Sequence, residues 1–391
     1  MSSPNEIFGS RTAGGRLTID LGALTSNYRL LQEHSGAAET AAVVKANAYG
    51  LGVDVVVPAL LLAGCKAFYV AQIDEGIEVR KLAPDARIFV IYGAPKGTES
   101  TLLAHNLMPL LCSAEQLDRW GQYIRKVGKP CPYGLHIDTG MNRSGLTMTE
   151  ARLVGMHSDV LKASGLGHMM THPACADDPA HMLNTKQTAL FQELKEIFSG
   201  IESSYTNSAA LLSGGACGGD VTRPGIALYG GEALNDVANI MKPVVKAEAR
   251  IIQIRHAKLG ETVSYGATVS LKRDTKIAVC AVGYADGYHR SAGSGTARGL
   301  IENHAESMRQ PPERPAGFVC GQRALILGRV TMDFTMFDVT DVPDAALDEA
   351  DYVELFGTNI ALDDVARAGG TIGYELLTSL GQRYERSIIN G

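Results

Sequence analysis

The chain has 391 residues, of which 45% are hydrophobic and 20% are charged, so two folded domains are expected and disordered or fibrous classes are excluded. A net charge of −6, without a cluster of arginine and lysine, argues against a nucleic-acid partner. Seven cysteines are scattered without a C-x-x-C pair, the pattern of reduced thiols in a cytoplasmic protein. Residues 1–15 lack the apolar stretch of a signal peptide. The longest apolar run, 55–63, is interrupted by Pro58 and too short to span a bilayer, so no membrane association is expected.

From about residue 41, short apolar runs alternate with segments of helical periodicity. The runs predict strands at 41–46, 67–71, 87–92, 108–112, 133–138, 165–171, 204–208 and 223–228. Helices are expected between them, as at 113–127 and 185–198, with Ser113 and Thr185 as N-caps and Gln116 completing a capping box. This alternation indicates a parallel sheet, and eight repeats in roughly 200–250 residues favour a closed (β/α)8 TIM-like barrel. A doubly wound sheet is the alternative architecture. It typically has a glycine-rich turn after the first strand, and the sequence has none there.

The pattern changes near residue 243. Short runs at 244–254, 276–282, 323–328, 333–339 and 351–356 are punctuated by glycine, proline and aspartate, which predicts a mainly antiparallel β domain. The predicted domains are therefore 14–242 and 243–391, and the short run 16–19 is a candidate extra strand of the second domain. A long polar stretch, 293–317, is expected to be a surface excursion.

Lys45 closes the first predicted strand, in the segment Ala-Ala-Val-Val-Lys-Ala-Asn-Ala-Tyr-Gly-Leu-Gly. A lysine at the mouth of a strand, with Tyr49 four residues later, is a candidate Schiff-base lysine, because a dry and rigid base lowers the pKa of an amine and fixes its direction. For a lone lysine, a side chain that reaches into solvent is the more ordinary interpretation. The residues at the other strand ends are therefore needed to distinguish a Schiff-base lysine from an ordinary solvent-exposed one.

Polar residues also follow four later strands, at the barrel end where catalytic groups collect. They are Asp138 and Arg143 after the fifth strand, His168 and His172 on the sixth, Asn207 and Ser208 after the seventh, and Arg223, Gly225 and Ile226 at the eighth. Each has an ordinary explanation, such as an Asx turn at Asp138 or a structural salt bridge at Arg223. The two histidines lack a third ligand nearby, so a satisfied polar histidine is favoured over a metal site. Their coincidence at several strand ends favours an active site.

Together with segments 262–267, 283–290, 328–333 and 371–375, these motifs resemble the alanine racemase family from about residue 14 to the C-terminus. The resemblance implies pyridoxal 5′-phosphate on Lys45 and interconversion of L-alanine and D-alanine, with D-alanine supplied for peptidoglycan. It also implies a homodimer whose sites are each completed by Tyr265 of the partner subunit and Met332 of the partner subunit.

Racemisation requires a base on each face of the planar intermediate. The cofactor makes the α-proton removable because its ring system takes up the electron pair. The resemblance implies that Lys45 takes the proton from D-alanine and Tyr265 takes it from L-alanine. Because the reference pKa of tyrosine is about 10, a hydrogen-bonded chain from Tyr265 through His172 to Arg223 is expected to favour the phenolate. Arg223 is also expected to face the pyridine nitrogen. Because a guanidinium does not donate its proton to that nitrogen, this arrangement is expected to discourage transamination.

The resemblance further implies the binding residues. The cofactor phosphate is expected to meet the backbone N–H groups near Gly225 and Ile226, the Ser208 hydroxyl, and the phenols of Tyr49 and Tyr374. Arg143 is expected to contact the cofactor's phenolic oxygen and the substrate carboxylate, aided by the Met332 N–H group. A narrow entrance is expected from Tyr284, Arg290, Arg329, Ile372 and Asp177.

One departure from the family concerns Arg143. Many members carry a lysine seven residues earlier, which becomes a carbamate and orients the arginine, but here that position is His136. Another group or a bound anion such as chloride must then hold Arg143.

Three other functions are considered for this sequence. Decarboxylases for basic amino acids share the architecture, but their Gly-Glu-Pro-Gly-Arg phosphate loop is missing. A cofactor-carrying homeostasis protein would consist of the barrel alone, without the region bearing Tyr265 and Met332. A racemase of wider specificity, acting on serine or other amino acids, is the alternative that the sequence discriminates least.

Overall fold

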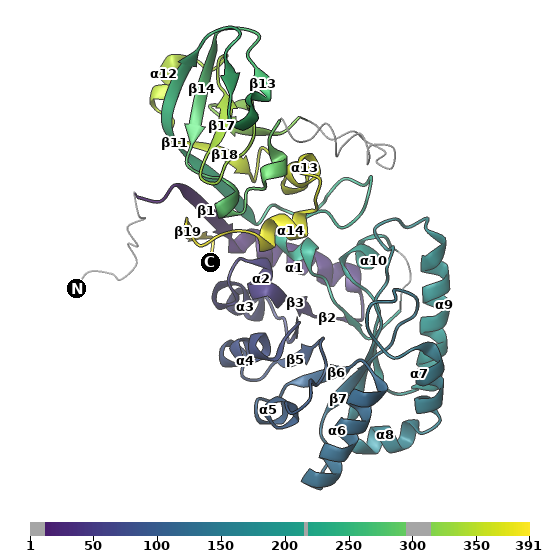
Figure 1. The fold of residues 1–391 in the computed structure, drawn as a ribbon. Coiled ribbons are helices and arrows are strands. Elements are labelled where there is room, and N and C mark those ends of the chain that lie inside the picture. Colours follow the sequence, from purple (N-terminus) through teal and green to yellow (C-terminus); the bar gives the residue numbers. More distant parts are fainter. Residues whose placement is uncertain (1–11, 215–217, 295–313) are drawn as a thin grey trace, which may run out of the picture. The chain divides into compact units, whose positions relative to one another are not determined.

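The computed structural model describes residues 12–214, 218–294 and 314–391, and the chain divides into two compact units (Figure 1). The barrel unit is Leu24–Met241, and the β unit combines Met1–Ala23 with Lys242–Gly391. Each unit has its own sheet and its own core.

The barrel unit contains a parallel sheet of seven strands in sequence order. They are β3 (Ala42–Val43), β4 (Ala67–Val70), β5 (Arg87–Val90), β6 (Met108–Leu111), β7 (Tyr133–His136), β8 (Leu166–Met170) and β9 (Glu202–Ser204). A further strand, β10 (Val221–Thr222), pairs in parallel with β2 (Glu39–Thr40). Backbone hydrogen bonds from Asp220 N–H to Ser203 O (2.7 Å) and from Ala41 N–H to Thr222 O (3.0 Å) connect β10 to both ends of the sheet. The barrel is therefore closed, and the predicted fold class is confirmed.

Helices lie around the outside of these strands (Figure 1). They are α3 (Val53–Leu62), α4 (Ile73–Leu82), α5 (Glu99–Ala104), α6 (Ala114–Val127), α7 (Met148–Gly155), α8 (Ser158–Ser164) and α9 (Met182–Ile197). Ser113 caps α6 as predicted, but Gln116 accepts from Cys112 N–H (3.2 Å) and so does not complete the capping box. Thr185 is not an N-cap, because α9 begins three residues earlier, where the His181 ring accepts the Leu183 N–H.

The last two predicted strands were misplaced. The seventh strand was predicted at 204–208, but the observed strand β9 (Glu202–Ser204) ends at the first residue of that range. The eighth is Val221–Thr222, and Ile226–Tyr229 forms a 3₁₀ helix, η1, instead of a strand. All four η1 residues are buried, and a short buried apolar run does not distinguish a strand from a helix.

The β unit is built on an eight-stranded sheet. Its strands are β1 (Gly15–Asp20), β11 (Val245–Ala257), β14 (Thr275–Cys280), β15 (Ala316–Val319), β16 (Gln322–Leu325), β17 (Thr335–Asp338), β18 (Tyr352–Phe356) and β19 (Tyr384–Ile389). Strand β1 pairs with β11 antiparallel and with β19 in parallel, and the other pairs are antiparallel. Most of the excursion predicted at 293–317 lies outside the described residues. Within the part of the chain that is described, every helix is too short or too polar to cross a bilayer.

Candidate active site

Lys45 begins α2 (Lys45–Tyr49), a turn of unusual backbone directly after β3. The four residues Ala46 to Tyr49 all have positive φ, between 53° and 55°. This left-handed conformation costs an L-residue roughly 1–2 kcal/mol, and none of the four is glycine. Such strain persists only where the surroundings hold it, and it is concentrated at functional sites.

The Lys45 amine is half-buried among positive charges. Burial lowers its pKa most, the charges of Arg143 and Arg223 lower it further, and the Glu75 carboxylate opposes them. A lowered pKa leaves more of the amine neutral, which is the form that attacks a carbonyl or accepts a proton.

Arg223 is buried without a carboxylate partner among the described residues. Its Nε donates to Ser204 Oγ (2.6 Å), and its Nη2 donates to the carbonyl oxygens of Thr171 (2.6 Å) and Tyr205 (3.1 Å). Burial lowers the pKa of Arg223 to about 10, so the guanidinium remains protonated at neutral pH. Its Nη1 has no hydrogen-bond partner within the described chain and is free to meet a ligand.

Two histidines stand near the arginines. Burial lowers the pKa of His136 to about 4, with Arg223 and Arg143 acting in the same direction. The pKa of His172 lies well below its ordinary value because of burial, then Arg223 and Arg143. Both imidazoles are therefore neutral at neutral pH, and the buried Nδ1 of His136 has no hydrogen-bond partner in the structure as described. Arg143 itself is exposed, yet its charge reaches both histidines, Lys45 and Arg223.

The residues expected to hold a phosphate also meet in the barrel unit. Ser208 Oγ accepts the Gly225 N–H at 2.8 Å and the Ala227 N–H at 3.4 Å. A Cβ on Gly225 would lie 2.4 Å from the Tyr49 hydroxyl, which places that phenol beside the same backbone. Because the Gly225 and Ala227 N–H groups both donate to Ser208 Oγ, the Ile226 N–H between them is the donor that this backbone leaves for an anion among the described residues.

In the β unit, four of the predicted residues lie on adjoining loops. Tyr265 begins the 3₁₀ helix η2 (Tyr265–Ala267), and the preceding Ser264 donates to Arg329 O at 2.8 Å. Tyr284 N–H donates to Thr331 O at 3.0 Å, next to Met332. Tyr265 is 73% exposed and Met332 54% exposed, so both side chains are available to another surface.

The other predicted residues of this unit are also at its surface. Ile372 is 60% exposed, and Tyr374, on α14 (Gly373–Thr378), is 38% exposed. Arg290 begins the 3₁₀ helix η4 (Arg290–Ala292). Asp177 belongs to the barrel unit, where its backbone carbonyl accepts the Asn235 N–H at 2.9 Å.

Sequence reasoning missed a buried hydrogen-bonded chain in the barrel. His168 bonds to Tyr69 through Nε2 (2.9 Å) and to Glu202 through Nδ1 (2.7 Å), so its prediction as a satisfied polar histidine is confirmed. The Arg223 guanidinium lies 5.6 Å from the centroid of the Tyr69 ring. Residues at the same layer of a barrel come from alternate strands, and that spacing could have suggested the pairing of Tyr69 with His168.

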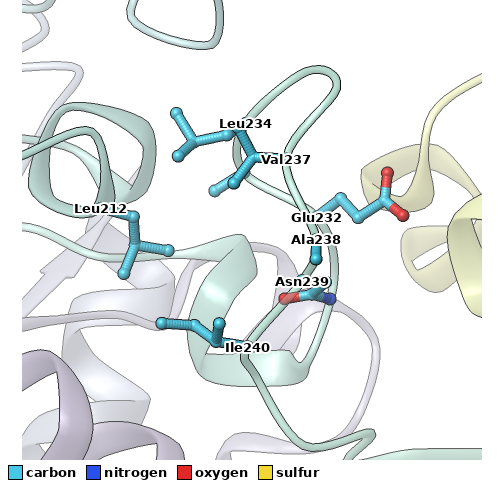
Figure 2. A pocket seen from close by; sticks show the side chains of 8 residues that line it. Leu212, Glu232, Leu234, Val237, Ala238, Asn239 and Ile240 are labelled. Carbon is cyan, nitrogen blue, oxygen red and sulfur yellow. The ribbon is translucent and has the colours of Figure 1, made fainter.

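A pocket of the barrel unit lies between the C-terminal end of α10 (Ser208–Leu212) and the loop 232–240, which follows η1 (Figure 2). It is lined by Leu212, Glu232, Ala233, Leu234, Val237, Ala238, Asn239 and Ile240. This mostly aliphatic lining contains none of the predicted catalytic residues.

Comparison with known proteins covers nearly the whole chain. Residues 19–233 match the alanine racemase N-terminal domain, and residues 244–388 match the alanine racemase C-terminal domain. The chain is 48% identical to an alanine racemase of Rhizobium meliloti over 97% of this chain and 98% of that protein. The chain is also 48% identical to a biosynthetic alanine racemase of Agrobacterium fabrum, over 98% of this chain and 96% of that protein. It is 39% identical to a catabolic alanine racemase of the same organism, over 96% of this chain and 92% of that protein.

Among solved structures, the alanine racemase from Bartonella henselae with covalently bound pyridoxal phosphate superposes with a TM-score of 0.86 at 32% identity, covering 96% of this chain and 100% of that one. Two family domains in succession, relatives of nearly equal length, and a shared fold all agree. The chain belongs to the alanine racemase family.

Proposed function

We propose that this chain interconverts L-alanine and D-alanine with pyridoxal 5′-phosphate held by Lys45. The observation that carries the proposal is the half-buried Lys45 amine, whose pKa is lowered among Arg143 and Arg223 at the carboxyl ends of the barrel strands. The relatives named alanine racemase support alanine as substrate, and the Bartonella henselae structure supports the cofactor.

The donors of the barrel unit fit the cofactor's phosphate. The hydroxyls of Ser208 and Tyr49 and the Ile226 N–H are neutral groups suited to a phosphate, without needing a lysine or arginine. The Gly225 N–H, which donates to Ser208 Oγ in the structure, and the Tyr374 phenol are the further donors that we infer from the family resemblance. Pyridoxal 5′-phosphate would supply a carbonyl group for the Lys45 amine and a ring system that accepts the electron pair left when the α-proton is removed.

Two residues move the proton. The neutral amine of Lys45 accepts it at Nζ from D-alanine, and the phenol oxygen of Tyr265 accepts it from L-alanine. Each base returns a proton in the reverse direction, so inversion needs the two on opposite faces of the reacting carbon. Tyr265 lies in the other unit, on a loop separate from any barrel strand.

Two arginines are proposed to bind the substrate carboxylate and the cofactor's pyridine nitrogen. Arg143, together with the Met332 N–H, holds the substrate carboxylate by a charge-assisted contact. Arg223 would hold the cofactor's pyridine nitrogen and would keep its own proton, because its pKa of about 10 lies above neutral pH. His172, whose pKa responds to the Arg223 charge, is proposed to link this arginine to the Tyr265 phenol, although no hydrogen bond joins His172 to Arg223 among the described residues. His136, or an anion beside its unpartnered Nδ1, orients Arg143.

The active assembly is a homodimer in which each site takes Tyr265 and Met332 from the opposite copy. Their exposure supports this, because large apolar and aromatic side chains at adjoining surface loops are typical of an interface. Tyr284, Arg290, Arg329, Ile372 and Asp177 form the entrance and limit the size of the substrate side chain.

The physiological role we propose is supply of D-alanine for peptidoglycan in the cytoplasm. The greater identity with the biosynthetic enzyme of Agrobacterium fabrum than with its catabolic one supports this role.

A chiral product assay tests the proposed function. The purified protein, dialysed with and without pyridoxal 5′-phosphate, is given L-alanine, L-serine and other small L-amino acids. Formation of D-alanine only with the cofactor is expected. No D-alanine, or faster turnover of another amino acid, would contradict the assignment.

A further inference from the structure

The left-handed turn that carries Lys45 is held by a carboxylate from another helix. Glu75 lies in the first turn of α4, and its Oε1 accepts the Ala46 N–H at 2.7 Å. Its Oε2 accepts the N–H groups of Ala71 (2.7 Å) and Gln72 (3.1 Å). One carboxylate therefore ties the residue after Lys45 to the loop between β4 and α4.

Two further hydrogen bonds hold the turn to itself and to the next helix. Ala48 N–H donates to Val44 O at 2.9 Å, and Asn47 Oδ1 accepts the Val53 N–H at 2.9 Å. Neither bond reaches a neighbouring strand of the barrel. The Glu75 carboxylate instead connects the turn to the segment between β4 and α4, and it acts at Ala46, the first left-handed residue, directly after Lys45.

The carboxylate of Glu75 also acts on Lys45 through its charge. It raises the pKa of Lys45 against the stronger lowering by burial and by Arg143 and Arg223. The hydrogen bond and the charge are thus two separable effects of one side chain.

We propose that Glu75 is a positioning residue for Lys45, because its carboxylate holds the Ala46 N–H and thereby fixes the strained turn from which the amine projects. This inference rests on the proposed function, in which Lys45 binds the cofactor. The competing explanation is that Glu75 serves only its own helix, since Gln72 and Glu75 form a capping box on α4.

The chain contains a matched control for that explanation. Glu150 completes the same kind of capping box on α7, where it accepts the Thr147 N–H at 2.8 Å while Thr147 Oγ1 accepts the Glu150 N–H at 3.2 Å. None of its hydrogen bonds within the described chain reaches the Lys45 turn. Replacing Glu75 or Glu150 by alanine therefore removes, in each case, the carboxylate that accepts the N–H of its own N-cap residue, but only Glu75→Ala also releases Ala46.

The first measurement is release of pyridoxal 5′-phosphate from substrate-free holoenzyme into an excess of a carbonyl scavenger. Glu75→Ala is expected to release it roughly tenfold or more faster than Glu150→Ala, the factor expected for loss of a hydrogen bond to a charged group. Glu75→Gln keeps an amide oxygen for Ala46 and should restore most of the slow release. Equal rates in Glu75→Ala and Glu150→Ala would overturn the inference.

The second measurement uses apoprotein and follows acylation of Lys45 by a small anhydride across pH, read by peptide mass spectrometry. Glu75→Gln should move the acylation profile to lower pH, because the carboxylate charge that favours the protonated amine is gone. If Glu75→Ala fails to fold by circular dichroism, Glu75→Asp and Glu150→Asp replace the alanine pair in the release assay. An aspartate keeps the charge but is too short to span both contacts, and equal release from this pair would likewise overturn the inference.

Failure of the proposed function would look different. Lys45→Ala is carried through the same release assay, and borohydride reduction of the wild type should fix the cofactor to the peptide containing Lys45. A cofactor fixed to another lysine contradicts the proposed function, whatever Glu75 does.

Discussion

Gly225 lies so close to Tyr49 that a Cβ atom on the glycine would stand 2.4 Å from the tyrosine hydroxyl oxygen and 3.2 Å from the ring carbon that bears it. Gly225 directly precedes η1, and the ring of Tyr49 stacks on Tyr229 at a centroid distance of 4.6 Å. The phenol therefore has little room to retreat, and the glycine is required by close approach rather than by its φ angle.

Gly225→Ala should weaken the binding of pyridoxal 5′-phosphate and destabilise the protein by about 1–3 kcal/mol, the usual cost of overpacking. Urea unfolding of apoprotein measures the stability, and fluorescence titration measures the cofactor affinity. Tyr49→Phe removes the oxygen that clashes, so the double variant should recover most of the lost stability. Gly167→Ala, where an added Cβ meets nothing within 4 Å, is the control. An additive double variant would mean that the two residues do not crowd each other.

Lys45→Ala should abolish the visible absorbance of the cofactor and lower racemisation by at least about a thousandfold, because it removes both the covalent attachment and one base. Absorption spectra and the chiral product assay measure the two effects. Lys66→Ala, at an exposed lysine of the same unit, should change neither. Visible absorbance retained in Lys45→Ala would contradict the assignment.

Tyr265→Phe should impair proton removal from L-alanine more than from D-alanine. The phenol is the base proposed for only one face, and loss of a general base typically costs roughly 10²–10⁴-fold. Exchange of the α-hydrogen with solvent deuterium, followed separately from each enantiomer, measures the asymmetry. Tyr284→Phe provides the matched control, since Tyr284 is also an exposed tyrosine on an adjoining loop of the same unit. Equal losses from both enantiomers in Tyr265→Phe would argue against two bases.

Much of the barrel could be predicted because its strands are buried runs bounded by polar turns. β4 to β8 lie within two residues of their predicted limits. β10 could not be delimited in this way, because the apolar side chains of Ile226–Tyr229 are buried in a 3₁₀ helix at the end of the barrel, and β9 (Glu202–Ser204) contains no apolar residue. Hydrophobicity reports burial, and only the backbone hydrogen bonds distinguish the two conformations.

The candidate site divides along a similar line. Lys45 could be singled out from its place at a strand end, but the left-handed turn that follows it could not, since no glycine announces positive φ. Glu75 and Glu202 act through contacts with segments 29 and 34 residues away, which no local pattern encodes. Reactive residues at strand ends can therefore be predicted from a sequence, whereas the residues that hold them in position become visible only in the tertiary structure.

His136 should make the stability of the barrel unit fall as the solution becomes acidic. Its pKa is lowered from about 6.5 to about 4 by burial and by the two arginines, so the unfolded chain binds a proton more readily than the folded one. Its stabilising contribution is fully present above pH 6.5 and is lost as the pH falls through 4, amounting to roughly 3 kcal/mol across the whole window.

His136→Asn removes this titration while keeping a polar side chain. Urea unfolding of the apoprotein between pH 8 and pH 5 should show that the free energy of unfolding falls less steeply in His136→Asn than in the wild type. His34→Asn, at an exposed histidine on α1 (Leu21–Ser35), is the control for loss of an imidazole from the surface. Identical pH slopes for wild type and His136→Asn would mean that folding leaves the pKa of His136 unchanged, so that neither its burial nor the two arginines would alter its protonation.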